Sequence, residues 1–232
     1  MMNIHDLELV RGEIAEAETK AKREKGSVTL MAVSKLHPYE DILQAYHAGQ
    51  RLFGENHVQE ILEKFPSRKP EGMELHLIGH LQMNKVKKVV SAVEGIDSVD
   101  SFRLLQKIDA ECAPFGKVMP VLLEFNTSGE EAKSGFPTDE ELFSAISAAT
   151  DLPHISIRGL MTVGPLEGGE EKTREAFRHL KALQMECRDR FPSFSFSTLS
   201  MGMSADFPIA IQEGSTMVRV GTKIFGVRNY AT

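Results

Sequence analysis

The feature that most constrains the fold is a repeated alternation of short apolar runs with segments of helical periodicity. Eight apolar runs of strand length occur, at residues 29–33, 51–53, 75–78, 96–99, 118–125, 155–163, 196–199 and 217–220. Segments with helical spacing lie between them, at residues 38–49, 56–64, 82–92, 101–112, 138–149, 170–190 and 204–212. Strands that alternate with helices pair in parallel, because each crossover returns the chain to the same end of the sheet. Eight such units predict an α/β fold, a single (β/α)8 TIM barrel.

An open doubly wound sheet is the alternative, but no G-x-G-x-x-G follows the first strand and no domain linker is evident. We therefore expect one domain over residues 1–232. Residues 3–24 place apolar side chains at helical spacing among many charges. They predict an amphipathic N-terminal helix that packs on the barrel.

Composition narrows the function and the location. The chain has 27 Lys+Arg and 33 Asp+Glu, a net charge of −6, which disfavours a nucleic-acid partner. It contains no long uncharged apolar segment, and its N-terminus carries acidic residues where a signal peptide would be apolar or basic. The expectation is a cytoplasmic protein without a membrane partner. Two cysteines far apart, Cys112 and Cys187, predict buried thiols and no disulfide framework.

Polar residues gather at the C-terminal ends of the apolar runs, which is where the chemistry of such barrels lies. Lys35 is predicted to end the strand that the first run forms. Partial removal from water there would favour a neutral amine that can form an imine with a carbonyl compound. A lysine at a strand end can equally extend into solvent, so Lys35 alone does not define a site.

A second polar group follows the last two runs. Residues 200–204 read Ser-Met-Gly-Met-Ser, and Gly221-Thr222 follows the eighth run. Glycines let backbone N–H groups approach an anion, and the loops after strands seven and eight form the usual phosphate site of this barrel. With Lys35 they indicate either a sugar phosphate in an imine-forming aldolase or pyridoxal 5′-phosphate (PLP). Arg219, at the end of the eighth strand, favours PLP because it could donate to the pyridine nitrogen.

Motifs at these strand ends resemble those of the pyridoxal phosphate homeostasis proteins, the YggS or PROSC family. The resemblance covers residues 30–228 and rests on Ala32-Val-Ser-Lys35, Phe53-Gly-Glu-Asn56-x-x-Gln59-Glu, His76-x-Ile-Gly79-His-Leu-Gln82-x-Asn-Lys85, Gly159-Leu-Met161, Leu199-Ser-Met-Gly-Met-Ser204-x-Asp206 and Ser215-x-x-x-Arg219-Val-Gly221-Thr-x-Ile-Phe-Gly226.

The resemblance implies a fold-type III PLP barrel, similar to the N-terminal domain of alanine racemase, with PLP held as an internal aldimine on Lys35. It implies that Asn56 lies near the ring and that Arg219 faces the pyridine nitrogen. The residues that it assigns to the phosphate are Ser200, Gly221 and Thr222.

The family's role implies that the protein stores or delivers PLP, with PLP-dependent apo-enzymes as partners and without a strong catalytic activity. A small PLP-dependent amino-acid racemase is the alternative. Racemases of similar fold use a tyrosine from a second domain of a partner chain, and this chain has only Tyr39, Tyr46 and Tyr230. We expect no catalytic residues, no metal and a monomer. His76 and His80 would lie about 13 Å apart along one strand, too far apart for one ion.

Overall fold

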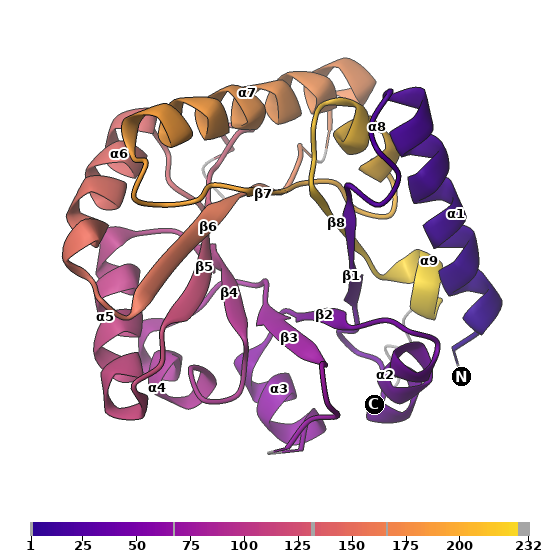
Figure 1. The fold of residues 1–232 in the computed structure, drawn as a ribbon, viewed down its shortest axis with the longest axis horizontal. Coiled ribbons are helices and arrows are strands. Elements are labelled where there is room, and N and C mark those ends of the chain that lie inside the picture. The colour runs from indigo at the N-terminus through magenta and orange to yellow at the C-terminus, as the bar shows by residue number, and fades with distance from the viewer. Residues whose placement is uncertain (1, 67, 131–132, 166, 227–232) are drawn as a thin grey trace.

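The computed structural model describes residues 2–66, 68–130, 133–165 and 167–226. Within them, eight parallel strands form a closed barrel in chain order, with β8 paired to β1 (Figure 1). The strands are β1 (Thr29–Val33), β2 (Leu52–Glu55), β3 (Glu74–Leu77), β4 (Gly95–Val99), β5 (Met119–Glu124), β6 (Ile155–Met161), β7 (Thr198–Ser200) and β8 (Met217–Val220). This confirms the predicted (β/α)8 barrel, since all eight predicted runs form strands.

Helices surround the barrel and follow the predicted segments closely (Figure 1). They are α1 (Ile4–Lys20), α2 (Tyr39–His47), α3 (Val58–Lys64), α4 (Val86–Val89), α5 (Phe102–Cys112), α6 (Asp139–Ala148), α7 (Gly169–Arg190), α8 (Phe207–Gln212) and α9 (Thr222–Phe225).

Several helices are shorter than predicted, as two examples show. The segment 82–92 forms a 3₁₀ turn, Met83–Lys85, followed by the single turn of α4. The helix expected from residue 204 begins at Phe207, because residues 203–206 form a turn in which the Met203 N–H donates to Asp206 Oδ1 at 2.6 Å. The short helix α9 was not predicted from the sequence.

The N-terminal helix α1 packs on the outside of the barrel against α8 and α9 (Figure 1). It buries Leu7, Val10 and Ile14. It ends earlier than predicted, at Lys20, where the nearby Glu18 carboxylate accepts hydrogen bonds from the N–H groups of residues 26 and 28 (2.9 and 2.8 Å). Burying this charged side chain is tolerable because backbone donors satisfy it. These bonds direct the chain from the helix into β1.

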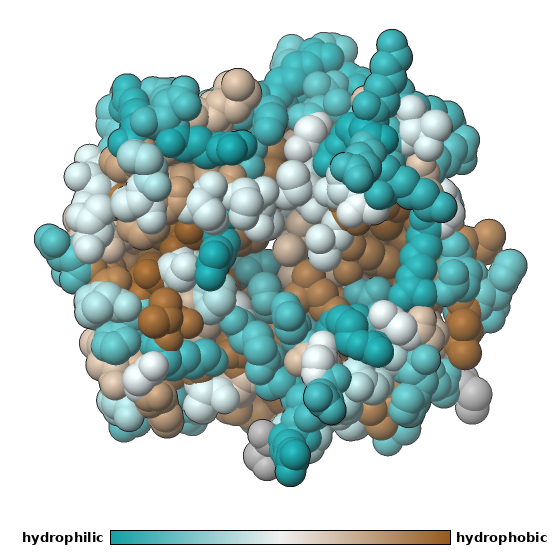
Figure 2. Space-filling model, viewed as in Figure 1, coloured by the Kyte–Doolittle hydropathy of each residue, from teal (hydrophilic) through white to brown (hydrophobic). Residues whose placement is uncertain are grey.

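Two apolar cores hold the structure together. The larger lies between strands and helices, and a small one inside the barrel contains Met31, Leu52 and Met217. Arg219 pairs with Met31 in the β1–β8 register and therefore shares the interior face. Figure 2 shows hydrophilic residues over most of the helices and a hollow near the centre of this view. In the described part of the chain, no helix is long and apolar enough to cross a membrane.

Candidate functional site at the strand ends

A cavity of about 370 Å³ opens at the C-terminal ends of the strands, and we call it the Lys35 cavity. It is lined by Val33, Lys35, Asn56, Ile78, Val163, Met203, Ser204, Ala205, Arg219, Gly221 and Thr222. Five of the six residues predicted from the sequence are among them, although they come from opposite ends of the chain. Ser200 is the exception.

Lys35 lies in a tight turn two residues beyond β1, whereas the sequence predicted that it ends the strand. The His37 N–H donates to the Ser34 carbonyl oxygen (3.1 Å), and Leu36, the third residue of the turn, has φ of 63°. Positive φ at the third residue is typical of a type II turn, where glycine is usual. It costs another residue on the order of 1–3 kcal/mol, so surrounding contacts must hold the turn.

Three charged side chains hold this turn, Glu55 at the end of β2 and Glu60 and Lys64 on α3, and we call them the turn clamp. Lys64 Nζ donates to Glu60 Oε1 (2.6 Å), to Glu55 Oε1 (2.8 Å) and to the Ser34 carbonyl (3.0 Å). The Ser34 hydroxyl donates to Glu55 Oε1 (2.7 Å), and the Leu36 N–H donates to Glu60 Oε1 (2.5 Å). The clamp thus fixes the peptides on both sides of the lysine.

The Glu55 carboxyl is fully buried. Burial raises its pKa, although the Lys64 ammonium and the Ser34 hydroxyl oppose the rise. Both hydrogen bonds go to Oε1, and Oε2 has no partner among the described residues. The clamp therefore depends on Lys64 to stabilise a charge that has left water.

Arg219 forms the inner wall of the Lys35 cavity. It is 4% exposed, and its Nη1 and Nη2 donate to Ser200 Oγ (2.7 Å) and to the Thr162 carbonyl (2.8 Å). Burial lowers its pKa, and three nearby carboxylates oppose the fall, so the guanidinium stays charged. Ser200 is buried behind Arg219 and holds it in place, which explains why Ser200 does not line the cavity.

The end of the cavity next to β7 and β8 carries two hydroxyl groups and closely packed backbone. Ser204 and Thr222 supply the hydroxyls. A Cβ on Gly221 would lie 2.9 Å from the Val33 carbonyl oxygen, so this position requires glycine. Gly202 has φ of 95°, a conformation that also favours glycine.

Acidic groups extend the site into the barrel. Burial raises the pKa of Glu124 to about 7, although Arg219 opposes the rise. His76 Nδ1 lies 3.0 Å from Asp97 Oδ1. Burial lowers the pKa of His76, but the charge and hydrogen bond of Asp97, together with the charges of Glu74 and Glu94, outweigh burial, and the net shift is upward. One of the carboxyl groups that face Arg219, that of Glu124, therefore changes its charge near neutral pH.

Sequence reasoning did not identify Lys64 or the apolar wall residues Ile78 and Val163. The Glu60–Lys64 pair had a visible signal, since a glutamate four residues before a lysine is a typical helical ion pair. His76 and His80 each pair with a separate aspartate, Asp97 and Asp100. Cys112 and Cys187 are buried free thiols in helices, as predicted.

Comparison with known proteins places this barrel in a class. Residues 6–229 match the family model of the alanine racemase N-terminal domain. An alanine racemase of Clostridium difficile has the same fold at a TM-score of 0.76 but only 16% identity, and the match covers 96% of this chain and 56% of that one. The fold and the lysine-bearing cavity thus define a barrel of the alanine racemase N-terminal domain class.

Closer relatives identify the family within that class. The pyridoxal phosphate homeostasis protein of Haemophilus influenzae is 39% identical over 234 residues, which cover 100% of this chain and 98% of that protein. The homologue of the same name from Pasteurella multocida is 40% identical over 229 residues, 97% of each chain. PipY of Synechococcus elongatus, solved with PLP bound, has 35% identity and a TM-score of 0.79, over 92% of this chain and 100% of that chain. The chain belongs to the family of pyridoxal phosphate homeostasis proteins, which confirms the resemblance seen in the motifs.

Proposed function

We propose that this protein binds PLP in the Lys35 cavity and stores or delivers it to PLP-dependent apo-enzymes, without a strong catalytic activity of its own. One observation carries the proposal: a primary amine, a buried guanidinium and a glycine-lined, hydroxyl-bearing end share one cavity. PipY, solved with PLP bound, and the relatives named for PLP homeostasis support it.

The residues present fit the cofactor. When bound, PLP supplies an aldehyde that condenses reversibly with a primary amine. Lys35 would hold the aldehyde carbon, Asn56 would contact the ring, and Arg219 would face the pyridine nitrogen. Gly221 and Thr222 would hold the phosphate. Ser200 would contribute to the site only by fixing Arg219. Ser204 lines the cavity, which favours its hydroxyl as the second donor to the phosphate, beside that of Thr222.

Two features support the absence of strong catalysis. Arg219 keeps its charge and therefore favours an unprotonated ring nitrogen, which weakens the ring as an electron sink. Among the described residues, no tyrosine lines the cavity. Tyr46 donates to the Glu71 carbonyl (2.8 Å), Tyr39 packs on Phe65, and Tyr230 lies outside the described residues. The tyrosine that racemases of similar fold use is therefore absent from the described lining of the cavity.

The domain, the oligomeric state and the location complete the proposal. Residues 1–232 form one PLP-binding domain that includes the N-terminal helix, which packs on the barrel. The protein acts in the cytoplasm as a monomer, and the monomer is supported by a cavity that residues of one chain enclose in the described structure. Light scattering of the purified protein tests the monomer directly.

Absorption spectroscopy and borohydride trapping test the proposal. We expect a near-violet band that borohydride abolishes, and a phosphopyridoxyl adduct that peptide mapping places on Lys35. Lys35→Ala should lose the adduct, whereas Lys223→Ala, on the exposed side of α9, should keep it. No adduct after addition of PLP would refute the proposal. Sustained racemisation of an amino acid, lost in Lys35→Ala, would refute its non-catalytic part.

A further inference from the structure

A second, polar cavity of about 280 Å³ adjoins the Lys35 cavity at the ends of β2 and β3. The two cavities share Asn56. The other polar residues that line the second cavity include His80, Gln82 and Lys85. They belong to the motif at residues 76–85, which the proposed function does not use. The volume lies just below the range of about 300–1,000 Å³ for drug-sized ligands, which favours a small ligand.

Lys85 differs from the other half-buried lysines. Those outside the Lys35 cavity all have an acceptor: Lys64 contacts Glu60 at 2.6 Å, Lys69 the Ala92 carbonyl at 2.7 Å, Lys107 Glu111 at 2.7 Å, Lys117 the Val90 carbonyl at 2.8 Å, Lys133 Glu130 at 2.8 Å and Lys181 Gln184 at 2.9 Å. Among the described residues, the Lys85 ammonium has neither a hydrogen-bond acceptor nor an ion-pair partner, and it lines a cavity. An ammonium group carries three donors, so an acceptor is expected to come from outside the chain.

The remaining lining has the same chemical character. No carboxylate lines this cavity, since the nearby Asp100 binds His80 Nδ1 (3.1 Å) and is not part of the wall. The side chains of Asn56 and Gln82 have no hydrogen-bond partner in the described part of the chain. Two amide groups and one ammonium therefore offer donors to the same space, and an oxyanion is the ligand that accepts from all three.

We propose that this second cavity binds a small oxyanion, the carboxylate or phosphate group of a small metabolite, with Lys85 as its cation and Gln82 and Asn56 as neutral donors. Anion binding at Lys85 does not depend on PLP. The further consequence rests on the proposed function: because the cavities share Asn56, the bound anion lies beside the cofactor. The Lys35 cavity then has its phosphate end at β7–β8 and a second anion site at β2–β3.

Nuclear magnetic resonance titration tests the proposal, with inorganic phosphate and acetate as probes and sodium chloride at equal ionic strength as the reference. The Lys85 side-chain signals and the amide signals of Gly79 and Gln82 report this cavity. PLP-loaded protein is used alongside PLP-free protein, because phosphate could also enter the empty Lys35 cavity. We expect saturable shifts at these signals in both forms. Saturable shifts with phosphate but not with acetate indicate a phosphoester ligand. Saturable shifts with acetate indicate a carboxylate ligand.

Matched lysine variants complete the test. Lys85→Gln should weaken the anion binding seen at Gly79 by at least about tenfold, the loss expected when a charged donor is removed. Lys87→Gln, at an exposed position of α4 two residues further along the chain, should bind as the unchanged protein does. Absent shifts, or equal affinity in Lys85→Gln, would overturn the proposal. PLP binding without anion binding refutes this inference alone, and anion binding without PLP binding refutes the proposed function alone.

Discussion

Replacement of Lys64 by methionine removes the one cation of the turn clamp while keeping most of the side-chain volume. The Lys64 side chain is 11% exposed and the Glu55 side chain 0% exposed, so the change leaves a buried carboxylate without its counter-ion. Removing one partner of a buried pair costs about 3–5 kcal/mol. We expect about 3 kcal/mol, at the lower end, because Glu55 can take up a proton.

The cost should depend on pH in a definite direction. Burial already raises the pKa of Glu55, and loss of Lys64 raises it further. When a carboxyl group has a higher pKa in the folded state than in the unfolded state, the protein loses stability as the pH rises through the folded-state pKa. The deficit of Lys64→Met in urea unfolding should therefore be smaller at pH 5 than at pH 8. It should also shrink in the Glu55→Gln background, where no charge is left uncompensated.

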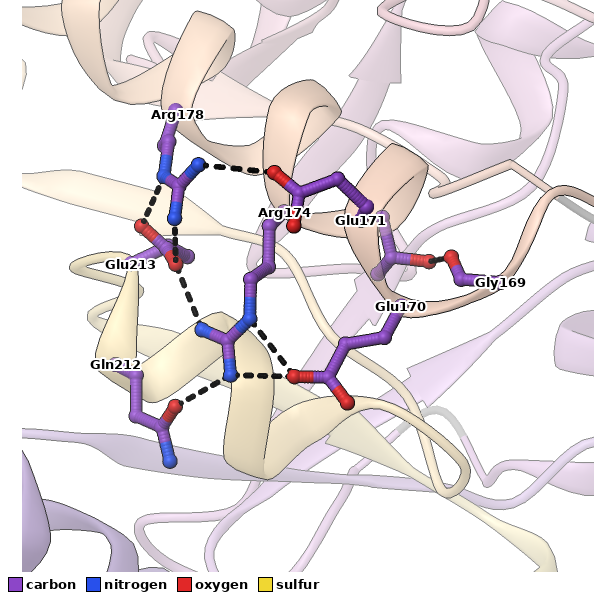
Figure 3. Close-up of polar contacts among 8 residues, drawn as sticks. Gly169, Glu170, Glu171, Arg174, Arg178, Gln212 and Glu213 are labelled. Carbon is purple, nitrogen blue, oxygen red and sulfur yellow. Dashed lines mark hydrogen bonds and ion pairs between the residues drawn. The ribbon is translucent and has the colours of Figure 1, made fainter.

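The clamp should matter for the cofactor beyond its effect on stability. We expect Lys64→Met to lower the fraction of PLP trapped on Lys35. Arg174→Met is the control, because Arg174 bonds Glu213 (2.7 Å) and Glu170 (2.9 Å) in a network on α7 and α8 (Figure 3). That network contains no residue lining the Lys35 cavity. Unfolding free energies within about 0.5 kcal/mol of the unchanged protein, or equal trapping in both variants, would refute the reasoning.

Three further predictions concern other parts of the molecule. Burial raises the pKa of Glu124 from 4.5 to about 7, so stability should fall between these pH values. Glu124→Gln should remove that fall, which amounts to about 3 kcal/mol, and an unchanged pH profile in urea unfolding would contradict this. Gly202→Ala should destabilise the protein by about 3 kcal/mol, because φ is 95° and the new Cβ would lie 2.5 Å from Ala210 Cβ. Gly12→Ala, in α1 with open space around it, should instead raise the melting temperature slightly. Burial raises the pKa of Cys187 to about 12, so a thiol reagent should label it at pH 8 only in urea, and rapid labelling of the folded protein would show that the thiol is accessible.

Local sequence was sufficient for the fold and for most of the predicted cavity lining. The apolar runs and helical segments repeat within stretches of about 30 residues, and their alternation leaves few arrangements other than a parallel barrel. Strand ends follow directly from the runs, so the sequence alone assigns Lys35, Asn56 and Arg219 to one end of the barrel. Barrel closure then brings β1 beside β8, and with it Lys35 close to Gly221.

Side-chain contacts between distant segments could not be read from the chain. Ser200 ends β7 and Ser204 follows it by four positions, but only Ser204 lines the Lys35 cavity. The Ser200 hydroxyl instead accepts a hydrogen bond from Arg219, 19 positions further along the chain. Lys64 reaches the carbonyl of Ser34 across 30 positions. The pKa of Glu124 and the absence of a partner for Lys85 among the described residues likewise depend on which groups closure brings near them. A sequence pattern records which face a residue occupies, whereas burial and hydrogen bonding depend on atoms that only the closed barrel brings into contact.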